Sequence, residues 1–271
     1  MTDDLDDRES LRATFDTVAS AYADARPTYP ASLFDALASA TGIGEESLLL
    51  EVGCGPGVAT LPLAARGCRI VAVELGEGLA AEARRRLAAY PKVSVVTAPF
   101  EAWPPGEHSY DLVYAATAWH WVGPHVRYRR AYEVLRADGH LAFWSASHVV
   151  PRDGDPFFRE IQEVYDEIGE GVPDDHVWLG PGELPDQTAE IVASGLFDVA
   201  VVRQLDWENT YDAGSFIALL DTFSGHIAME DAKRAHLYAE IRRRLAERPD
   251  GLLRRHWGAV LHVAAPRVHL G

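Results

Sequence analysis

The sequence predicts an α/β fold: a doubly wound, mostly parallel sheet with helices on both faces. Through the first half of the 271-residue chain, short apolar runs alternate with amphipathic segments, which is the pattern of a parallel sheet with crossover helices. The runs are continuously apolar, as is typical of strands that are covered on both faces. They lie roughly 20 to 25 residues apart, the length of a strand–helix–strand unit with short loops, and right-handed crossovers then produce a doubly wound sheet.

Five strands are expected in this first half. Each is a short apolar run that is bounded by glycine or by polar residues. The predicted ranges are 47–52, 69–74, 92–97, 110–115 and 140–145.

Helices are expected between these strands. Leu79, Ala83 and Leu87 recur at helical spacing, so they predict the buried face of one helix. A second helix is expected over residues 128–135, and residues 138–139 (Asp-Gly) are expected to form a turn before the next strand.

The second half of the chain is less regular. Residues 151–186 are rich in Pro, Gly, Asp and Glu and contain one expected helix, 157–168, so they are interpreted as an insertion over the sheet edge. A strand over 197–207, an amphipathic helix over 235–248 and a last strand over 258–264 follow. The last two strands would complete a seven-stranded sheet as a hairpin.

Charge and cysteine content exclude several classes of protein. The formal net charge of −16 argues against a nucleic-acid or anionic-membrane surface, because binding a phosphate backbone requires clustered Lys and Arg. Two cysteines, Cys54 and Cys68, form neither a disulfide framework nor a metal cluster and fit a reducing compartment. The chain starts without a signal-peptide pattern and contains no apolar run long enough to span a bilayer. We therefore expect a cytoplasmic protein without nucleic-acid or membrane partners; its oligomeric state is not indicated.

The most informative stretch is a glycine-rich loop after the first strand. Residues 51–57 read Glu-Val-Gly-Cys-Gly-Pro-Gly and precede a helix that is expected to begin near Val58. Glycines at alternate positions permit positive φ and close approach of the backbone to a ligand. A dinucleotide fingerprint has its third glycine one position later than Gly57, and a Walker loop is excluded because no Gly-Lys-Ser/Thr follows.

Two carboxylates narrow the choice of ligand. Glu51 lies inside the strand, against the loop, and suits a ligand with an ammonium group better than one with a pyrophosphate, since like charges at short range are costly. Glu74 ends the second strand and can accept hydrogen bonds from both hydroxyls of a ribose. Ribose recognition fits NAD as well as an adenosyl ligand, so only Glu51 and the glycine spacing distinguish the two.

Residues 50–57, Leu-Glu-Val-Gly-Cys-Gly-Pro-Gly, resemble the first motif of the class I S-adenosylmethionine-dependent methyltransferases. The resemblance extends over residues 48–147 and implies a Rossmann-like fold. It also implies that the loop wraps the methionine part of S-adenosylmethionine, that Glu74 holds the ribose, and that the product is S-adenosylhomocysteine. No metal is implied.

Two further stretches resemble a narrower branch, the trans-aconitate methyltransferase-like group of small-molecule enzymes. One is residues 15–22 followed by Arg-Pro-Thr-Tyr-Pro at 26–30, and the resemblance implies that Tyr22 and Arg26 close over the carboxylate end of the cofactor. The other is the Ala-Trp-His-Trp-Val segment at 118–122. The family often has an acidic residue near adenine after the third strand, a place that Phe100 and Glu101 occupy here, without the usual Asp-Ala pair.

The predicted site has a cofactor part and an acceptor part. The cofactor-binding residues are Tyr22, Arg26, Glu51, Gly53, Gly55, Gly57, Glu74, Leu75, Phe100, Glu101 and Ala115. The residues of the substrate pocket are Trp119, His120, Trp121 and His148. His120 is the catalytic candidate, because it follows the fourth strand and an imidazole can act as a base near neutral pH; the alternative is a structural histidine between two tryptophans.

The sequence therefore predicts one domain that transfers a methyl group from S-adenosylmethionine to a small-molecule acceptor by in-line displacement. Alternatives are a nicotinamide-dependent oxidoreductase and a cofactor-binding protein without transferase activity. The predicted parts of the domain are an N-terminal lid with the first helices (1–46), a cofactor-binding core (47–150), an inserted cap (151–190) and a C-terminal part that completes the sheet and the substrate pocket (191–271).

Overall fold

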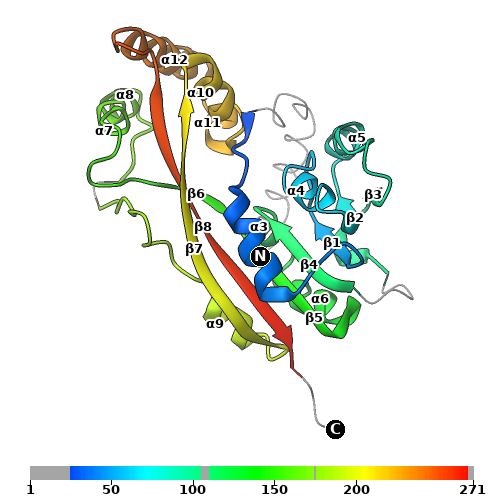
Figure 1. The fold of residues 1–271 in the computed structure, drawn as a ribbon. Coiled ribbons are helices and arrows are strands. Elements are labelled where there is room, and N and C mark those ends of the chain that lie inside the picture. The colour runs from blue at the N-terminus through cyan, green and yellow to red at the C-terminus, as the bar shows by residue number, and fades with distance from the viewer. Residues whose placement is uncertain (1–24, 105–109, 174, 268–271) are drawn as a thin grey trace.

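The computed structural model describes residues 25–104, 110–173 and 175–267, which form one mixed sheet with helices on both faces (Figure 1). The described strands are β1 (Leu48–Val52), β2 (Arg69–Glu74), β3 (Val93–Thr97), β4 (Tyr110–Ala116), β5 (Leu135–Trp144), β6 (Ala146–Val149), β7 (Phe197–Tyr211) and β8 (Leu253–Pro266). Their order is β3-β2-β1-β4-β5-β8-β6, with β7 paired to β8. The predicted doubly wound α/β fold is confirmed, and β6 is an additional strand.

The strand order of the sheet reverses at β1. The chain proceeds outward from β1 to β2 and β3, then returns to place β4 and β5 on the other side of β1, all in parallel pairs. The carboxyl ends of β1 and β4 therefore border the switch point at which ligands bind in open α/β sheets. On the far side, β8 runs antiparallel to β5, β6 and β7, and β7 and β8 form the long pair of arrows in Figure 1.

One local prediction is wrong: residues 138–139 do not form a turn ahead of the fifth strand. The strand begins at Leu135, which pairs with Tyr110. The next pair in the ladder is Leu112 with His140, so the residues between Leu135 and His140 bulge out of the parallel pairing.

Helices cover both faces of the sheet, and each face has its own core. One face is covered by α3 (Ala31–Thr41), α4 (Thr60–Ala64) and α5 (Glu77–Arg86), with Leu33, Leu63 and Ala83 in the core beneath them. The other is covered by α6 (Arg127–Val134) and α9 (Thr188–Ala193), through Ala131 and Ile191. The predicted buried face of α5 is confirmed, since Leu79, Ala83 and Leu87 are all buried.

A third core lies beside the end of the long β7–β8 pair. It joins α7 (Phe157–Glu160), α8 (Gln162–Glu167), α10 (Ala213–Leu220) and α12 (Asp231–Ala246), with the short α11 (Ser224–Ala228) between the last two. The predicted helix over 157–168 is thus divided into α7 and α8. The predicted subdivision of the chain into lid, core, cap and C-terminal part stays a prediction.

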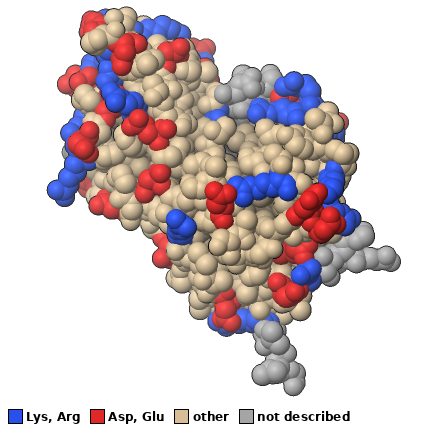
Figure 2. Space-filling view, viewed as in Figure 1, with Lys and Arg blue, Asp and Glu red and all other residues tan. Residues whose placement is uncertain are grey.

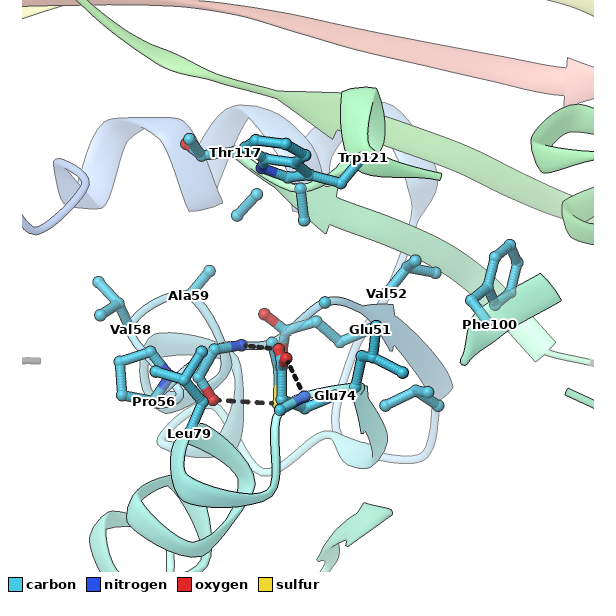
Figure 3. Close-up of a pocket in the computed structure, with 18 of the residues that line it drawn as sticks. Glu51, Val52, Pro56, Val58, Ala59, Glu74, Leu79, Phe100, Thr117 and Trp121 are labelled. Carbon is cyan, nitrogen blue, oxygen red and sulfur yellow. Dashed lines mark hydrogen bonds between the residues drawn. The ribbon is translucent and has the colours of Figure 1, made fainter. Parts of the chain in front are cut away.

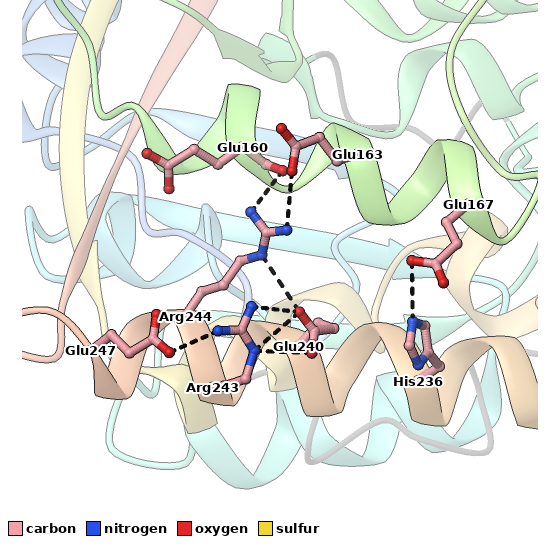
Figure 4. Close-up of polar contacts among 8 residues, drawn as sticks. All are labelled: Glu160, Glu163, Glu167, His236, Glu240, Arg243, Arg244 and Glu247. Carbon is pink, nitrogen blue, oxygen red and sulfur yellow. Dashed lines mark hydrogen bonds and ion pairs between the residues drawn. The ribbon is translucent and has the colours of Figure 1, made fainter.

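Polar contacts attach α7 and α8 to α12 (Figure 4). Arg244 donates to the main-chain oxygen of Glu160 at 3.0 Å and lies 3.3 Å from the carboxylate of Glu163. The ring of His236, nearer to the start of α12, lies 3.7 Å from the carboxylate of Glu167. The side chain of Arg244 is only 19% exposed, so its contacts are shielded from solvent more than those of an ordinary surface pair.

The outer surface is mixed in charge. On the face shown in Figure 2, Lys and Arg side chains of the described residues are interspersed with Asp and Glu and form no continuous basic surface. Among the helices of the described ranges, none combines the length and the apolarity needed to cross a bilayer.

The bulge in β5 leads to the first prediction. A Cβ at Gly139 would lie 2.8 Å from the main-chain oxygen of Tyr110 and 3.1 Å from that of Arg136, so Gly139→Ala must displace backbone. We expect a loss of about 1–3 kcal/mol in the free energy of unfolding, measured in urea. Gly44→Ala is the matched control, because a Cβ there meets nothing within 4 Å. Equal stability of the two variants would contradict the bulge.

Candidate ligand site at the switch point of the sheet

A cavity of about 690 Å³ opens at the carboxyl ends of β1, β2 and β4. Its walls come from the glycine loop after β1, the end of β2, the short helix η1 (Phe100–Ala102) and the segment after β4. Two segments distant in sequence complete it, residues 26–29 before α3 and residues 223–224 at the start of α11. The volume falls in the range of small-molecule and cofactor sites.

The glycine loop is held against β2. The N–H groups of Gly53 and Cys54 both donate to the main-chain oxygen of Val73, at 2.8 and 3.1 Å. Gly53 has a φ of 64°, and a Cβ there would lie 2.7 Å from the Cβ of Ala118, so the position requires glycine for both conformation and space. The predicted Gly57 lies outside the cavity lining, because it faces Leu87 behind the loop.

Glu51 is a buried carboxylate in the wall of the cavity. It is 1% exposed, and its Oε2 accepts hydrogen bonds from the Thr60 hydroxyl at 2.5 Å and the Tyr114 hydroxyl at 2.7 Å. Both hydroxyls donate to the same oxygen, so no described residue donates a hydrogen bond to Oε1. Figure 3 shows Glu51 beside Glu74.

Burial raises the pKa of Glu51 to about 7; the two hydroxyl donors lower it in part, and the negative charge of Glu74 raises it further. The ionised form therefore lacks a positive partner among the described residues around it. An ammonium group bound in the cavity would provide one.

Glu74 bridges two turns of the wall. Its Oε2 accepts the N–H of Gly55 at 2.7 Å and its Oε1 accepts the N–H of Gly76 at 2.9 Å (Figure 3). These two N–H groups orient the carboxylate at the edge of the cavity. The carboxylate thus fixes the glycine loop and presents two acceptors at the end of β2.

Phe100 and Glu101, which were predicted near adenine, line the cavity together with Leu75, a further predicted cofactor-binding residue. Leu75, which is 41% exposed, and the buried Phe100 both line it. Glu101 also lines it, and its carboxylate accepts the N–H of Gly123 at 3.3 Å. An apolar slot with one anchored carboxylate at its edge can hold a flat heteroaromatic ring.

At the end of β4 the structure places Ala116 and Thr117 in the wall in place of the predicted Ala115. Ala115 is fully buried on the opposite face of the strand, because successive side chains alternate. Thr117 has a φ of 56°, an unfavourable conformation for a β-branched residue. Its hydroxyl is 2.7 Å from the Tyr29 hydroxyl and accepts the N–H of Ala146 at 3.2 Å.

The aromatic segment after β4 divides between cavity and core. His120, which is exposed, and Trp121 line the cavity, with their rings 4.9 Å apart. Trp119 lies outside the lining, because it is buried and stacks on Phe143 at 5.4 Å. The segment forms the single turn η2 (Trp119–Trp121), from which the Trp119 ring enters the core while His120 and Trp121 line the cavity.

His148 also lies outside the lining. Its ring packs in the third core, 4.5 Å from Phe158 and 6.3 Å from Trp178. Burial lowers the pKa of His148 to about 2, and the nearby positive charge of Arg255 lowers it further, so the ring is neutral.

Arg26 connects the N-terminal segment to the start of α11. It donates to the main-chain oxygen of Thr222 at 2.9 Å, and its guanidinium lies 4.8 Å from the ring centroid of Phe223. This contact brings Phe223 and Ser224 into the cavity wall. The predicted Tyr22 lies outside the described residues.

The sequence prediction missed Tyr29 and Thr117. Tyr29 lies within the 26–30 segment that was predicted to close over the cofactor, so the sequence motif already indicated its neighbourhood. Thr117 carried no signal, because backbone strain is not visible in a residue pattern. The sequence of residues 222–226 is equally compatible with a pocket wall and with a turn that ends a helix, and the structure places Phe223 and Ser224 in the wall.

No group of three or more His, Cys, Asp and Glu side chains among the described residues is arranged to hold a metal ion. The donor set of the cavity instead suits an organic cation with hydroxyl groups. Two carboxylates, main-chain groups and apolar walls are its main components.

Comparison with known sequences gives a family for the core. Residues 49–139 match the family described as "Methyltransferase domain". An uncharacterized methyltransferase of Mycobacterium tuberculosis is 30% identical over 161 residues, which cover 55% of this chain and 63% of the relative. The chain thus spans less than two thirds of the length of the curated relatives it matches. Trans-aconitate 2-methyltransferase of Delftia acidovorans is 36% identical over 81 residues, 28% of this chain and 29% of that one.

Solved structures show the same fold. A provisionally assigned type II methyltransferase of Anaeromyxobacter dehalogenans is 25% identical, with a TM-score of 0.59 over 89% of this chain and 97% of that one. A methyltransferase of Thiobacillus denitrificans, solved with S-adenosylhomocysteine, is 16% identical, with a TM-score of 0.53 over 94% of this chain and 98% of that one.

The buried carboxylate leads to the second prediction. Because the pKa of Glu51 is raised from 4.5 to about 7 in the folded protein, folding stability from this group is complete below about pH 4.5 and is lost as the pH rises to 7. The loss is about 3 kcal/mol at most. Glu51→Gln does not titrate, so the unfolding free energy of the wild type should fall relative to that of the variant by about 1–3 kcal/mol between pH 5 and 8.

Urea unfolding at pH 5 and pH 8 measures this difference. Glu45→Gln is the control, because the Glu45 side chain is 71% exposed and its loss should leave the pH dependence unchanged. Parallel pH profiles for the wild type and Glu51→Gln would contradict the raised pKa.

Proposed function

We propose that this chain, which carries a class I S-adenosylmethionine-dependent methyltransferase domain, transfers a methyl group from S-adenosylmethionine to a small-molecule acceptor. The family predicted from residues 50–57 is confirmed by the match over residues 49–139. The observation that carries the proposal is the pair of carboxylates, Glu51 and Glu74, in one cavity wall with the glycine loop between them.

We assign the cofactor-binding residues by their chemistry. Glu51 faces the ammonium group, and the backbone of Gly53 and Gly55 follows the methionine chain. Glu74 accepts from the ribose hydroxyls, since it lines the cavity at the end of β2 and its carboxylate is oriented by the N–H groups of Gly55 and Gly76.

Phe100 packs on the adenine face, and Glu101 accepts from the adenine amino group. Leu75 covers the opposite side of the ring. Arg26, at the other end of the cavity, is placed beside the carboxylate of the methionine part, where a guanidinium is apt.

Bound S-adenosylmethionine would supply an electrophilic methyl carbon to the lone pair of the acceptor, with S-adenosylhomocysteine as the product. The chain's own contribution is positioning and exclusion of water. Trp121 and Tyr29 wall the volume beside Thr117, and the Tyr29–Thr117 hydrogen bond fixes that wall. The cavity volume of about 690 Å³ falls in the range of small-molecule sites, which supports a small acceptor beside the cofactor.

His120 is the proposed proton acceptor for substrates that are protonated at the working pH. It is exposed, lines the cavity and lies over Trp121. A base is required only for such substrates, since the sulfonium needs no activation.

The third prediction tests the cofactor. We expect calorimetry to detect binding of S-adenosylhomocysteine and not of NADH. Glu74→Ala should weaken the binding of S-adenosylhomocysteine by about tenfold or more, because the variant loses both the charged acceptor for ligand hydrogen bonds and the contact that anchors the glycine loop. Glu247→Ala, at a 65% exposed side chain on α12, is the matched control. Binding of NADH alone would favour the oxidoreductase alternative and overturn the proposal.

The fourth prediction tests His120. With an acceptor found by screening organic acids against radiolabelled S-adenosylmethionine, His120→Asn should lower kcat about 100-fold for a protonated nucleophile and leave the Kd of S-adenosylhomocysteine unchanged. His125→Asn serves as the control at a neighbouring exposed histidine. Unchanged kcat in His120→Asn would leave His120 as a wall residue.

A further inference from the structure

Arg255 is a buried cation without an acidic partner. It lies on β8 and is 8% exposed, and neither a hydrogen bond nor an ion pair joins its guanidinium to any described residue. Aromatic rings surround it instead, with the guanidinium carbon 4.5 Å from the ring centroid of Trp257 and 5.5 to 5.8 Å from those of Phe158, Phe216 and Phe223. Buried charges in proteins are normally paired.

The polar neighbours of Arg255 add no negative charge. His148 and His226 are both held neutral: burial lowers the pKa of His226 to about 4, and the positive charge of Arg255 contributes to the lowering for both rings. Tyr165 is hydrogen-bonded to His226 at 2.8 Å. Burial lowers the pKa of Arg255 itself to about 10, so it remains protonated at neutral pH. A cation, two neutral imidazoles and a phenol form a set of donors suited to an anion.

This cluster adjoins the acceptor end of the cavity. The ring of Phe223 lines the cavity and lies between two guanidiniums, that of Arg26 at 4.8 Å and that of Arg255 at 5.5 Å from its centroid. Ala146, in the cavity wall, is two positions before His148 on β6, so both side chains lie on one face of the strand. The wall at Phe223 and Ala146 therefore separates the cavity from Arg255 by one layer of side chains.

We propose that Arg255 is the anion-binding residue for the methyl acceptor, and that the acceptor accordingly carries a carboxylate or phosphate group. The acceptor's body lies in the cavity beside Ala146, and its anionic group displaces the Phe223 ring from the wall to reach the Arg255 guanidinium behind it. The inference rests on the proposed function, since it specifies the acceptor of the same site.

The anion-binding role and a purely structural role for Arg255 predict different melting temperatures. If Arg255 binds an anion, its unpaired buried charge costs stability in the free protein, so replacing it with an apolar side chain of similar length should leave the melting temperature unchanged or raised. If the aromatic rings around Arg255 existed to stabilise the fold through the cation, the same replacement would lower the melting temperature without changing affinity for an anion.

The first experiment uses the wild-type protein saturated with S-adenosylhomocysteine. Phenylacetate, phenyl phosphate and the neutral phenylacetamide are titrated by calorimetry. We expect at least one of the two anions to bind about tenfold or more tightly than the amide, and the preferred anion identifies the group. If neither anion binds more tightly than the amide, the inference is overturned. Absence of S-adenosylhomocysteine binding would instead overturn the proposed function.

The second experiment compares two neighbouring arginines. Arg255→Met should abolish the preference for the anion over the amide while S-adenosylhomocysteine still binds. Arg254→Met, at the exposed neighbour on the opposite face of β8, should keep the preference. Arg255→Gln is tested in parallel, so that one variant with a polar replacement is available. A retained preference in the folded Arg255 variants would overturn the assignment, as would equal losses in Arg254→Met.

Discussion

The position of the Glu51 carboxylate is the constraint on which the site depends. Glu51 lies inside the apolar strand β1, next to its last residue, and its burial is tolerated because the Thr60 and Tyr114 hydroxyls both donate to it. These two donors belong to α4 and β4, so one carboxylate joins the central strand to the helix after the glycine loop and to the strand beyond the switch point. The glycine loop follows Glu51 directly in the chain and is held in turn by the main-chain oxygen of Val73 and the carboxylate of Glu74.

The cavity is electrically polarised. Glu51 and Glu74 make the end near β1 and β2 acidic, and Arg26 and, behind Phe223, Arg255 make the end near α11 basic. A cationic cofactor and an anionic acceptor would each meet the opposite charge, which orients them relative to one another. The third core contributes the basic end, since Arg255 lies among its aromatic residues. Its unpaired charge weakens that core, a cost that proteins accept at functional sites.

Much of the fold was predictable from local patterns. Continuous apolar runs identified β1, β2 and β4 nearly to their ends, because strands covered on both faces need apolar residues at nearly every position. The edge strand β3 is only partly covered, but its run of β-branched residues identified it as well. The bulge in β5 was not predictable, because Asp138-Gly139 has the composition of a turn and only the pairing of Tyr110 with Leu135 incorporates it into the strand. The β6 strand was missed because its four residues are too short for a periodic signal.

The sequence by itself determined the proposed cofactor half of the site, since the glycine loop, Glu51 and Glu74 are a local motif within one strand–helix–strand unit, β1–α4–β2. Only the tertiary structure decided the acceptor half. It directs Trp119 and His148 into cores, and it brings Phe223 to Arg26, residues almost two hundred positions apart. The physical reason is that backbone motifs fix groups within a few residues, whereas side chains from different elements meet only where packing brings those elements together.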